Sequence, residues 1–155
     1  MIQRKQTLFL AASVVLFLST FAFPFGTIGI YELHNYKVIS PDGSAVSNIS
    51  TYYFSIPLAL ASLVSTYAIF IYANRQRQMA VVRISFIFYA ASFALMSLYI
   101  MNAVKAIGGE AFEWGVSFFL PFAAFFCNVI ALRGIKKDEQ LVKSLDRLRW
   151  EIWFS

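Results

Sequence analysis

Charged residues are absent from four long stretches of this 155-residue chain, at 6–31, 43–74, 84–104 and 114–132. Charged residues make up 14% of the sequence and apolar residues 59%, whereas soluble domains are about a quarter charged and about half apolar. A hydrocarbon core about 30 Å thick is crossed by about 20 helical residues, and helix satisfies the backbone there. The sequence therefore predicts an all-α membrane protein, a single membrane domain at 1–155. It would have four transmembrane helices, at about 7–25, 52–72, 84–104 and 114–132, in an antiparallel bundle.

Cysteine is nearly absent as well, since Cys127 is the only one. One cysteine excludes an intrachain disulfide and a thiolate metal site built by one chain. No serine stands in a nucleophile-elbow motif, and no glycine-rich phosphate loop follows a predicted strand. We therefore expect no enzymatic activity, no catalytic residue, no metal site and no cofactor.

Ionisable side chains are missing from the centres of all four predicted spans. Coupled transporters generally keep such a group at mid-membrane, which argues against ion- or proton-coupled transport. The polar residues that remain are mild ones, such as Ser62, Ser65, Ser92 and Asn128. They leave open a small transporter or a lipid-handling protein with a cavity lined by serine and asparagine.

Basic residues are distributed unevenly among the connections between the spans. Eleven of the 13 Lys and Arg residues fall in the N-terminal head, in the connection near residue 80 or in the C-terminal tail, and only Lys37 and Lys105 fall in the other two loops. Positive residues stay on the cytoplasmic side during insertion. This predicts a multi-pass membrane protein with both termini in the cytoplasm. The same rule explains the basic residues, so we expect no nucleic-acid partner.

The basic side chains could also contact anionic lipid headgroups or another membrane protein on the inner face. The residues in question are Arg75, Arg77, Arg83, Lys136, Lys137, Lys143, Arg147 and Arg149. The first span leaves a further alternative open. Arg4 and Lys5 followed by an apolar run, with Thr20-Phe21-Ala22 beyond it, also resemble a cleavable signal peptide.

The predicted outer loop at 26–51 contains a possible β-hairpin. Residues 30–39 are rich in β-branched and aromatic side chains, Pro41-Asp42-Gly43 supplies a turn, and 45–49 could form the return strand. Two strands alone are only marginally stable, so the hairpin must lean on the helices or on a partner. In the second outer loop, Gly108-Gly109 predicts a turn and Trp114 begins the fourth span at the interface.

Residues 134–155 form a predicted cytoplasmic tail. Leu141, Leu145, Leu148 and Ile152 share one helical face, and Glu139 with Lys143 makes a favourable i,i+4 pair. This predicts an amphipathic helix lying along the inner leaflet. A partner-binding helix and a straight extension of the fourth span are the alternatives.

The opening MIQRKQT and the closing run LRGIKKDEQLVKSLDRLR resemble the two ends of an uncharacterised bacterial family, found mainly in Bacteroidota. Its members are small integral membrane proteins with four helices and a domain of unknown function. The resemblance implies an inner-membrane location and the four-span plan, and it brings no biochemical activity.

The polar content therefore directs attention to the two ends of the molecule. The leading hypothesis is a non-enzymatic scaffold or accessory subunit that docks partners through the outer loop and the basic tail. A third hypothesis is a membrane enzyme that uses acids of the outer side. The candidate side chains of the outer side are Glu32, His34, Asp42, Glu110 and Glu113. The hypothesis requires Glu32, His34 and either Glu110 or Glu113 to converge within hydrogen-bond or metal-ligand reach.

Overall fold

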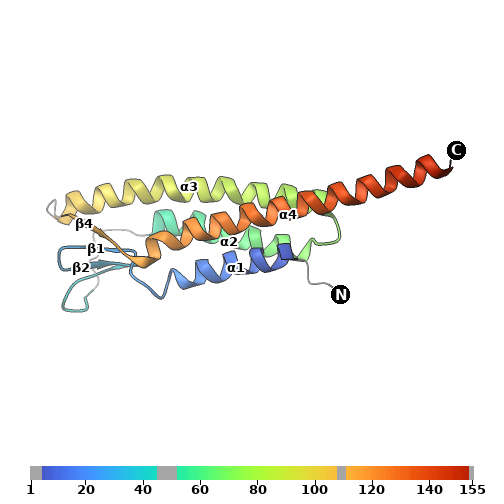
Figure 1. Ribbon diagram of the computed structural model, residues 1–155. Coiled ribbons are helices and arrows are strands. Elements are labelled where there is room, and N and C mark those ends of the chain that lie inside the picture. The colour runs from blue at the N-terminus through green and yellow to red at the C-terminus, as the bar shows by residue number, and fades with distance from the viewer. Residues whose placement is uncertain (1–4, 45–51, 108–110, 154–155) are drawn as a thin grey trace.

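The computed structural model describes residues 5–44, 52–107 and 111–153. The protein is mostly helical, with a small antiparallel sheet at one end (Figure 1). Its helices are α1 (Lys5–Ser19), α2 (Tyr52–Phe70), α3 (Arg75–Ile107) and α4 (Val116–Trp153). Each helix packs against the next, and α4 returns against α1. Among the described residues, α2, α3 and the Val116–Ser144 part of α4 are long and apolar enough to cross a bilayer, while the apolar part of α1 is shorter.

The first helix ends at Ser19, six residues before the end predicted from hydropathy. The Thr20 hydroxyl donates a 2.6 Å hydrogen bond to the Phe17 carbonyl, and the amides of Thr20, Phe21 and Ala22 bond to carbonyls three residues earlier. This tightens the chain into a 3₁₀-like turn. Pro24 then disfavours helix at the residue before it, so the chain leaves the helix although it stays apolar.

The third helix begins at Arg75, nine residues before its predicted start. The Asn74 side chain accepts a hydrogen bond from the Arg77 amide at 3.1 Å, the geometry of a helix N-cap. The basic segment that was predicted to be a loop is therefore the first turns of α3. Arg75, Arg77 and Arg83 all lie within that helix.

The fourth helix starts at Val116 rather than at Trp114 and continues without a break to Trp153. The predicted separate tail is thus the straight extension of the fourth span that the sequence left open. Gly134, mid-helix, does not act as a hinge. It costs about 1 kcal/mol in helix propensity, and it leaves room for Gln6, whose Cγ lies 2.7 Å from where a Cβ on Gly134 would stand.

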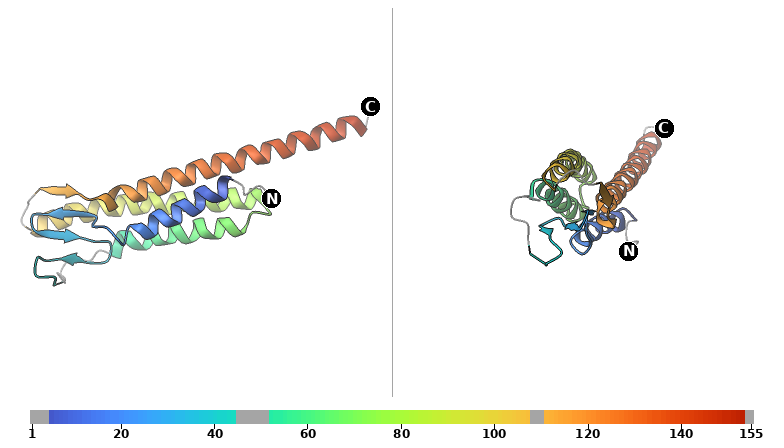
Figure 2. Two further views of the ribbon diagram at one scale, coloured as in Figure 1. Left: turned by 60° about the horizontal axis from the view of Figure 1, so that its bottom comes forward. Right: turned by 90° about the vertical axis from the view of Figure 1, so that its left-hand side faces the viewer.

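The sheet contains four short strands in the order β3-β2-β1-β4, all antiparallel. They are β1 (Gly26–Ile28), β2 (Tyr31–Leu33), β3 (Val38–Ile39) and β4 (Phe112–Trp114). The strands lie beyond the start of α4 and beside the last turns of α3 (Figure 2). The sheet thus joins the two loops that the sequence kept separate.

The outer loop contains antiparallel β-structure, as predicted, but its described strands differ from the predicted ones. Residues 30–39 are not one strand, because Gly29 at φ 58° turns the chain before β2 and a second turn at 34–37 precedes β3. The turn at Pro41-Asp42-Gly43 is present, with Gly43 at φ 74° and its amide bonded to the Ser40 carbonyl at 2.8 Å. The return strand at 45–49 and the Gly108-Gly109 turn lie outside the described residues.

Buried positions recur every three or four residues in each helix. On α3 they run from Gln78 to Ala103 without a break in this spacing, and α1, α2 and α4 follow the same rule. The buried positions are Gln6, Leu10, Ser13 and Phe17, with Thr20 just after α1; Phe54, Leu58, Ala61, Ser62, Ser65 and Ala68; Gln78, Val82, Ser85, Tyr89, Ser92, Met96, Tyr99 and Ala103; Ser117, Pro121, Ala124, Asn128, Ala131 and Ile135. Ser62, next to Ala61, is an additional position outside the regular spacing. This spacing is that of helices that cross at a small angle, as in coiled coils.

The interior is more polar than the surface of the helices. Small and hydroxyl-bearing residues occupy many buried positions, while Leu63, Phe70, Ile87 and Phe126 are each more than 60% exposed. Ala90 and Ala94 are exposed as well, whereas Tyr99 is buried.

A buried polar node joins α2, α3 and α4. The Ser65 hydroxyl donates to the Asn128 carbonyl oxygen at 2.9 Å, and the Asn128 amide donates to the Tyr89 hydroxyl at 3.4 Å. Ser13 of α1 is fully buried, and its hydroxyl donates to the Leu10 carbonyl of its own helix at 2.7 Å. Asn128 is therefore a central residue of the packing.

We expect Asn128→Ala to lower the free energy of unfolding by about 1–2 kcal/mol, because it breaks two contacts between helices and strands the buried Tyr89 hydroxyl. Unfolding in mixed micelles would measure the loss. Ser97→Ala is the matched control, since exposed Ser97 bonds only the Phe93 carbonyl of its own helix. Equal stability of the two variants would contradict a central role for the node.

We further expect Gly115→Ala to cost about 1–3 kcal/mol. Its Cβ would stand 2.4 Å from the Pro24 carbonyl oxygen, and backbone cannot easily move away. Gly134→Ala should cost less, because the flexible Gln6 side chain can shift and the helix gains about 1 kcal/mol in propensity. Thermal unfolding of both variants checks this order, and Gln6→Ala should remove whatever cost Gly134→Ala shows.

Candidate functional surfaces at the two ends

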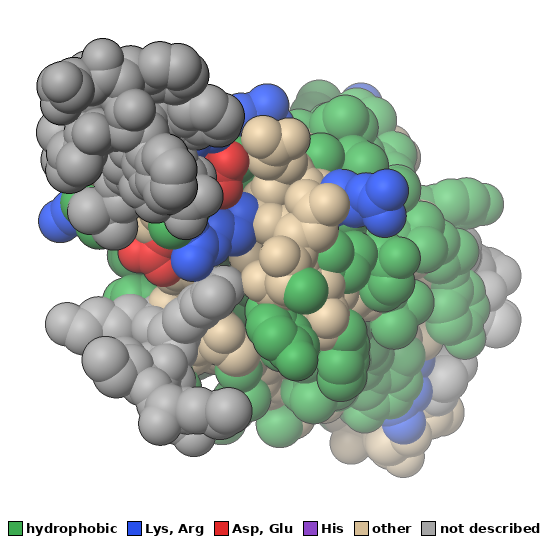
Figure 3. Space-filling model, turned by 90° about the vertical axis from the view of Figure 1, so that its right-hand side faces the viewer, with side chains coloured by type: hydrophobic (Ala, Val, Ile, Leu, Met, Phe, Trp, Pro, Cys, Tyr) green, Lys and Arg blue, Asp and Glu red, His purple; other side chains and the backbone are tan. Residues whose placement is uncertain are grey.

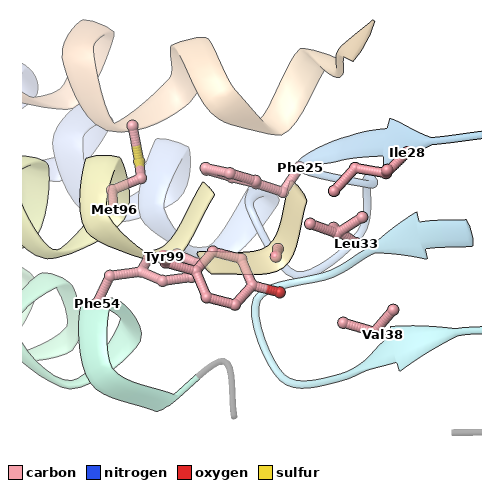
Figure 4. Close-up of a cluster of buried hydrophobic side chains, with 8 residues drawn as sticks. Phe25, Ile28, Leu33, Val38, Phe54, Met96 and Tyr99 are labelled. Carbon is pink, nitrogen blue, oxygen red and sulfur yellow. The ribbon is translucent and has the colours of Figure 1, made fainter. Parts of the chain in front are cut away.

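The inner face of the sheet is fixed to the helices by a hydrophobic cluster. Ile28, Leu33 and Val38 of the sheet pack with Phe25, Phe54 and Tyr99 (Figure 4). The Phe25 ring lies 5.2 Å from the Phe54 ring and 5.5 Å from the Phe118 ring, centre to centre. Such contacts hold the strands as a cap on α2, α3 and α4, which explains how short strands remain ordered.

Polar contacts also attach the sheet to the helices. The Thr20 carbonyl accepts hydrogen bonds from the Asn35 amide at 3.2 Å and from the Ser117 hydroxyl at 2.8 Å. Both donors are buried, so the end of α1, the loop after β2 and the start of α4 meet at one backbone oxygen. The sheet end is therefore a rigid part of the fold.

The outward face of the sheet carries a short polar row. Thr27 pairs with Glu32 on one side and with Glu113 on the other. The Thr27 hydroxyl donates to Glu113 at 3.4 Å. Because neighbouring strands are about 4.8 Å apart, the two glutamates stand about 10 Å from each other with Thr27 between them.

The acids predicted for the enzyme hypothesis are not gathered at one point among the described residues. His34 Nε2 lies 3.4 Å from Glu32 Oε2, but Glu113 is on the far side of β1 and Asp42 is exposed in the turn after β3. Glu110 lies outside the described residues. Within the described part of the chain, no group of three His, Cys, Asp or Glu side chains could hold a metal ion.

The opposite end, where α1 and α3 begin, is held by polar bonds to α4. The Gln6 amide donates to the Asp138 carboxylate, and the Arg75 guanidinium donates to the Asp138 backbone carbonyl at 2.9 Å. At the next residue of each helix, Gln76 contacts Glu139 at 3.4 Å, and Lys143 pairs with Glu139 at 3.4 Å. Asp138 thus ties three helices together.

The eight predicted headgroup or partner contacts consequently differ in their availability. Arg75 is committed to the joint with α4 and Lys143 to Glu139, whereas Arg77, Arg83, Lys136 and Lys137 are exposed. Arg147 and Arg149 lie on the last turns of α4. Seen from this end, basic and acidic side chains stand next to each other, and hydrophobic side chains cover the flank (Figure 3).

The sequence did not predict that Gln6 contacts Gly134 and Asp138 of α4. Gly134 and Asp138 are four residues apart and therefore share a helical face, which was a usable signal within α4. Nothing in the sequence pointed to Gln6 as their partner, because it lies more than 120 residues away.

Beyond this joint, α4 extends past the other helices (Figure 1). Leu141 is 55% exposed and Val142 is 39% exposed in this segment. The helical register places Leu145, Leu148 and Ile152 on the same face as Leu141. A polar cleft of about 420 Å³ lies at the base of the extension, between the α2–α3 connection and α4.

Comparison with known families accounts for nearly the whole chain. Residues 2–148 match a family described as a domain of unknown function, DUF4293. No curated protein matches the sequence. This match confirms the resemblance noted from the two chain ends. The chain, with its long apolar helices and small sheet, belongs to the DUF4293 family.

Proposed function

We propose that this chain is an integral membrane protein that acts as a non-enzymatic scaffold or accessory subunit. The observation that carries the proposal is the continuity of α4, which takes an apolar stripe beyond the helices that surround its first half. A segment of about 14 residues past the joint is about 20 Å long. Such an arm has no packing role within the described chain and offers a surface to a partner.

The distribution of polarity supports insertion of the helices in a bilayer. Many large apolar side chains face outward, while serine, glutamine and asparagine side chains are buried beside the apolar residues of the interior. Soluble helical proteins expose mainly polar side chains instead. The uncharged 84–104 segment of α3 is about 32 Å long, and α1 with its 3₁₀-like turn reaches about 28 Å. Four crossings of a bacterial inner membrane therefore fit the molecule.

The orientation follows from the distribution of charge. Helices α1 and α3 begin, and α4 ends, at the end where the basic residues are concentrated. The positive-inside rule places that end in the cytoplasm and the sheet outside. In this orientation, an α4 arm that continues the fourth span points away from the bilayer instead of lying on it.

Single cysteines test this orientation. In a Cys127→Ser background, Asp42→Cys should react with a membrane-impermeant maleimide in intact spheroplasts, because Asp42 is exposed beside the sheet. Lys143→Cys, which is exposed at the other end, should react only after permeabilisation. Mass tagging on gels reads out both reactions, and the opposite pattern would overturn the proposed topology.

The docking role is tested by position-specific crosslinking in native membranes. We expect a photoreactive residue at Leu141 to give a discrete, reproducible crosslink, because the exposed stripe begins there. The matched control is Lys143, which is 64% exposed on the opposite face of the same helix. If the protein migrates alone and neither position gives a crosslink, the scaffold proposal fails.

A small transporter or lipid-handling protein is the second candidate. Described hydroxyls of the interior, such as those of Ser65 and Ser92, are spent on bonds to Asn128 and to the Phe54 carbonyl rather than on lining a cavity. The observation that favours a lipid-related role lies instead on the outside, in a groove between α1 and α4.

A further inference from the structure

A groove between α1 and α4 combines exposed cations with an apolar floor. Its volume is about 310 Å³, the space of about ten water molecules in the liquid. Its lining is contributed by Gln6, Phe9, Ile130, Arg133, Gly134 and Lys137. Gly134 has no side chain, so the Gln6 side chain of α1 lies against α4 at this end of the groove.

Two cations of this groove have no acidic partner among the described residues. Arg133 and Lys137 are exposed and lie four residues apart on one face of α4. The acids next along the helix are already engaged, since Asp138 binds Gln6 and Glu139 binds Lys143. The groove therefore presents two adjacent positive charges that need an anion.

The apolar part of the groove lies on the side toward the middle of the helices. Ile130 is one turn before Arg133 and is 45% exposed, and Phe9 faces it from α1. Arg133 is the first charged residue after the uncharged 114–132 segment. In a bilayer, this order puts the cations at the level of the phosphates and the floor at the level of the acyl chains.

We propose that this groove is a binding site for one anionic phospholipid. The phosphate would contact Arg133 and Lys137, and the first methylenes of an acyl chain would lie on Phe9 and Ile130. A free phosphate ion would leave the apolar floor unused, and an acidic peptide would place polar backbone on it. The inference needs the membrane insertion proposed above, but it does not depend on the docking role of the α4 arm.

The test is lipid binding to the full-length protein in neutral detergent, measured by native mass spectrometry. The probes are phosphatidylglycerol, phosphatidylcholine with the same acyl chains, and sodium phosphate. We expect tight binding of one phosphatidylglycerol, and an affinity about 30-fold lower after Arg133→Ala with Lys137→Ala. Equal binding of the two lipids, or full displacement of phosphatidylglycerol by millimolar phosphate, would overturn the proposal.

Two further variants distinguish binding in the groove from general electrostatic attraction of anionic lipid to the basic end of the protein. Arg77→Ala with Arg83→Ala removes two exposed cations from α3, outside the groove, and should change the affinity less than about threefold. Ile130→Gln keeps every charge and should weaken phosphatidylglycerol without affecting phosphate. If the α3 pair matters as much as Arg133 and Lys137, the binding is diffuse and the groove is not a site.

These measurements also stand apart from the crosslinking at Leu141. A protein that binds phosphatidylglycerol in the groove but gives no crosslink keeps the lipid site and loses the scaffold role. A protein that gives a crosslink at Leu141 but shows no preference for anionic lipid keeps the scaffold role and loses the lipid site. An unchanged melting temperature confirms that the variants, whose altered side chains are exposed, are folded.

Discussion

The hydrogen bonds among Ser65, Tyr89 and Asn128 are the constraint on which the arrangement of the helices depends. An apolar helix in apolar surroundings gains little from any one rotation about its axis, because its faces are alike. A buried amide changes this, since it is satisfied in one orientation and stranded in the others. Because Asn128 of α4 bonds to Ser65 of α2 and to Tyr89 of α3, the node sets the rotation of these three helices together.

The consequences of that rotation reach both ends. Once Asn128 faces inward, the three- and four-residue spacing brings Ala131, Ile135 and then Asp138 to the same side of α4. Asp138 meets Gln6 and Arg75 there. In the other direction the spacing brings Ser117 inward to the Thr20 carbonyl, where the sheet is attached. The direction of the α4 arm and the position of the sheet are thus both fixed by the rotation of α4 that the buried node sets.

The sequence was sufficient for the helices and insufficient for their ends. Hydropathy located four apolar segments correctly, but it placed the end of α1 at 25 because it does not register the Thr20 hydroxyl or Pro24. It placed the start of α3 at 84 because arginines resemble a loop, although Asn74 caps a helix before them. The sheet could not be derived, because β1 and β4 come from different loops and their pairing depends on helices that hold Phe25 against Phe118. The Glu32–His34 contact follows from nearness in sequence, whereas the groove beside Arg133 requires the position of α1.

The two ends differ in which polar groups lack a partner, and this difference argues where function lies. Among the described residues of the sheet end they include two buried atoms, His34 Nδ1 and the Tyr99 hydroxyl oxygen. At the sheet end, Asn35, Ser117 and Glu113 all have partners within the chain, and Thr27 separates the glutamates that could otherwise have acted together. At the basic end, Asp138 and Glu139 already bind groups of the chain. Arg133 and Lys137 therefore lie beside an apolar groove without an acidic partner among the described residues, and Leu141 is exposed on the part of α4 that extends past the other helices. Unpaired charge and exposed apolar surface both favour binding to something outside the chain. Because the joint is rigid, a partner on the α4 arm and a lipid in the groove would be held about one to two helical turns apart, so each would lie within reach of the other.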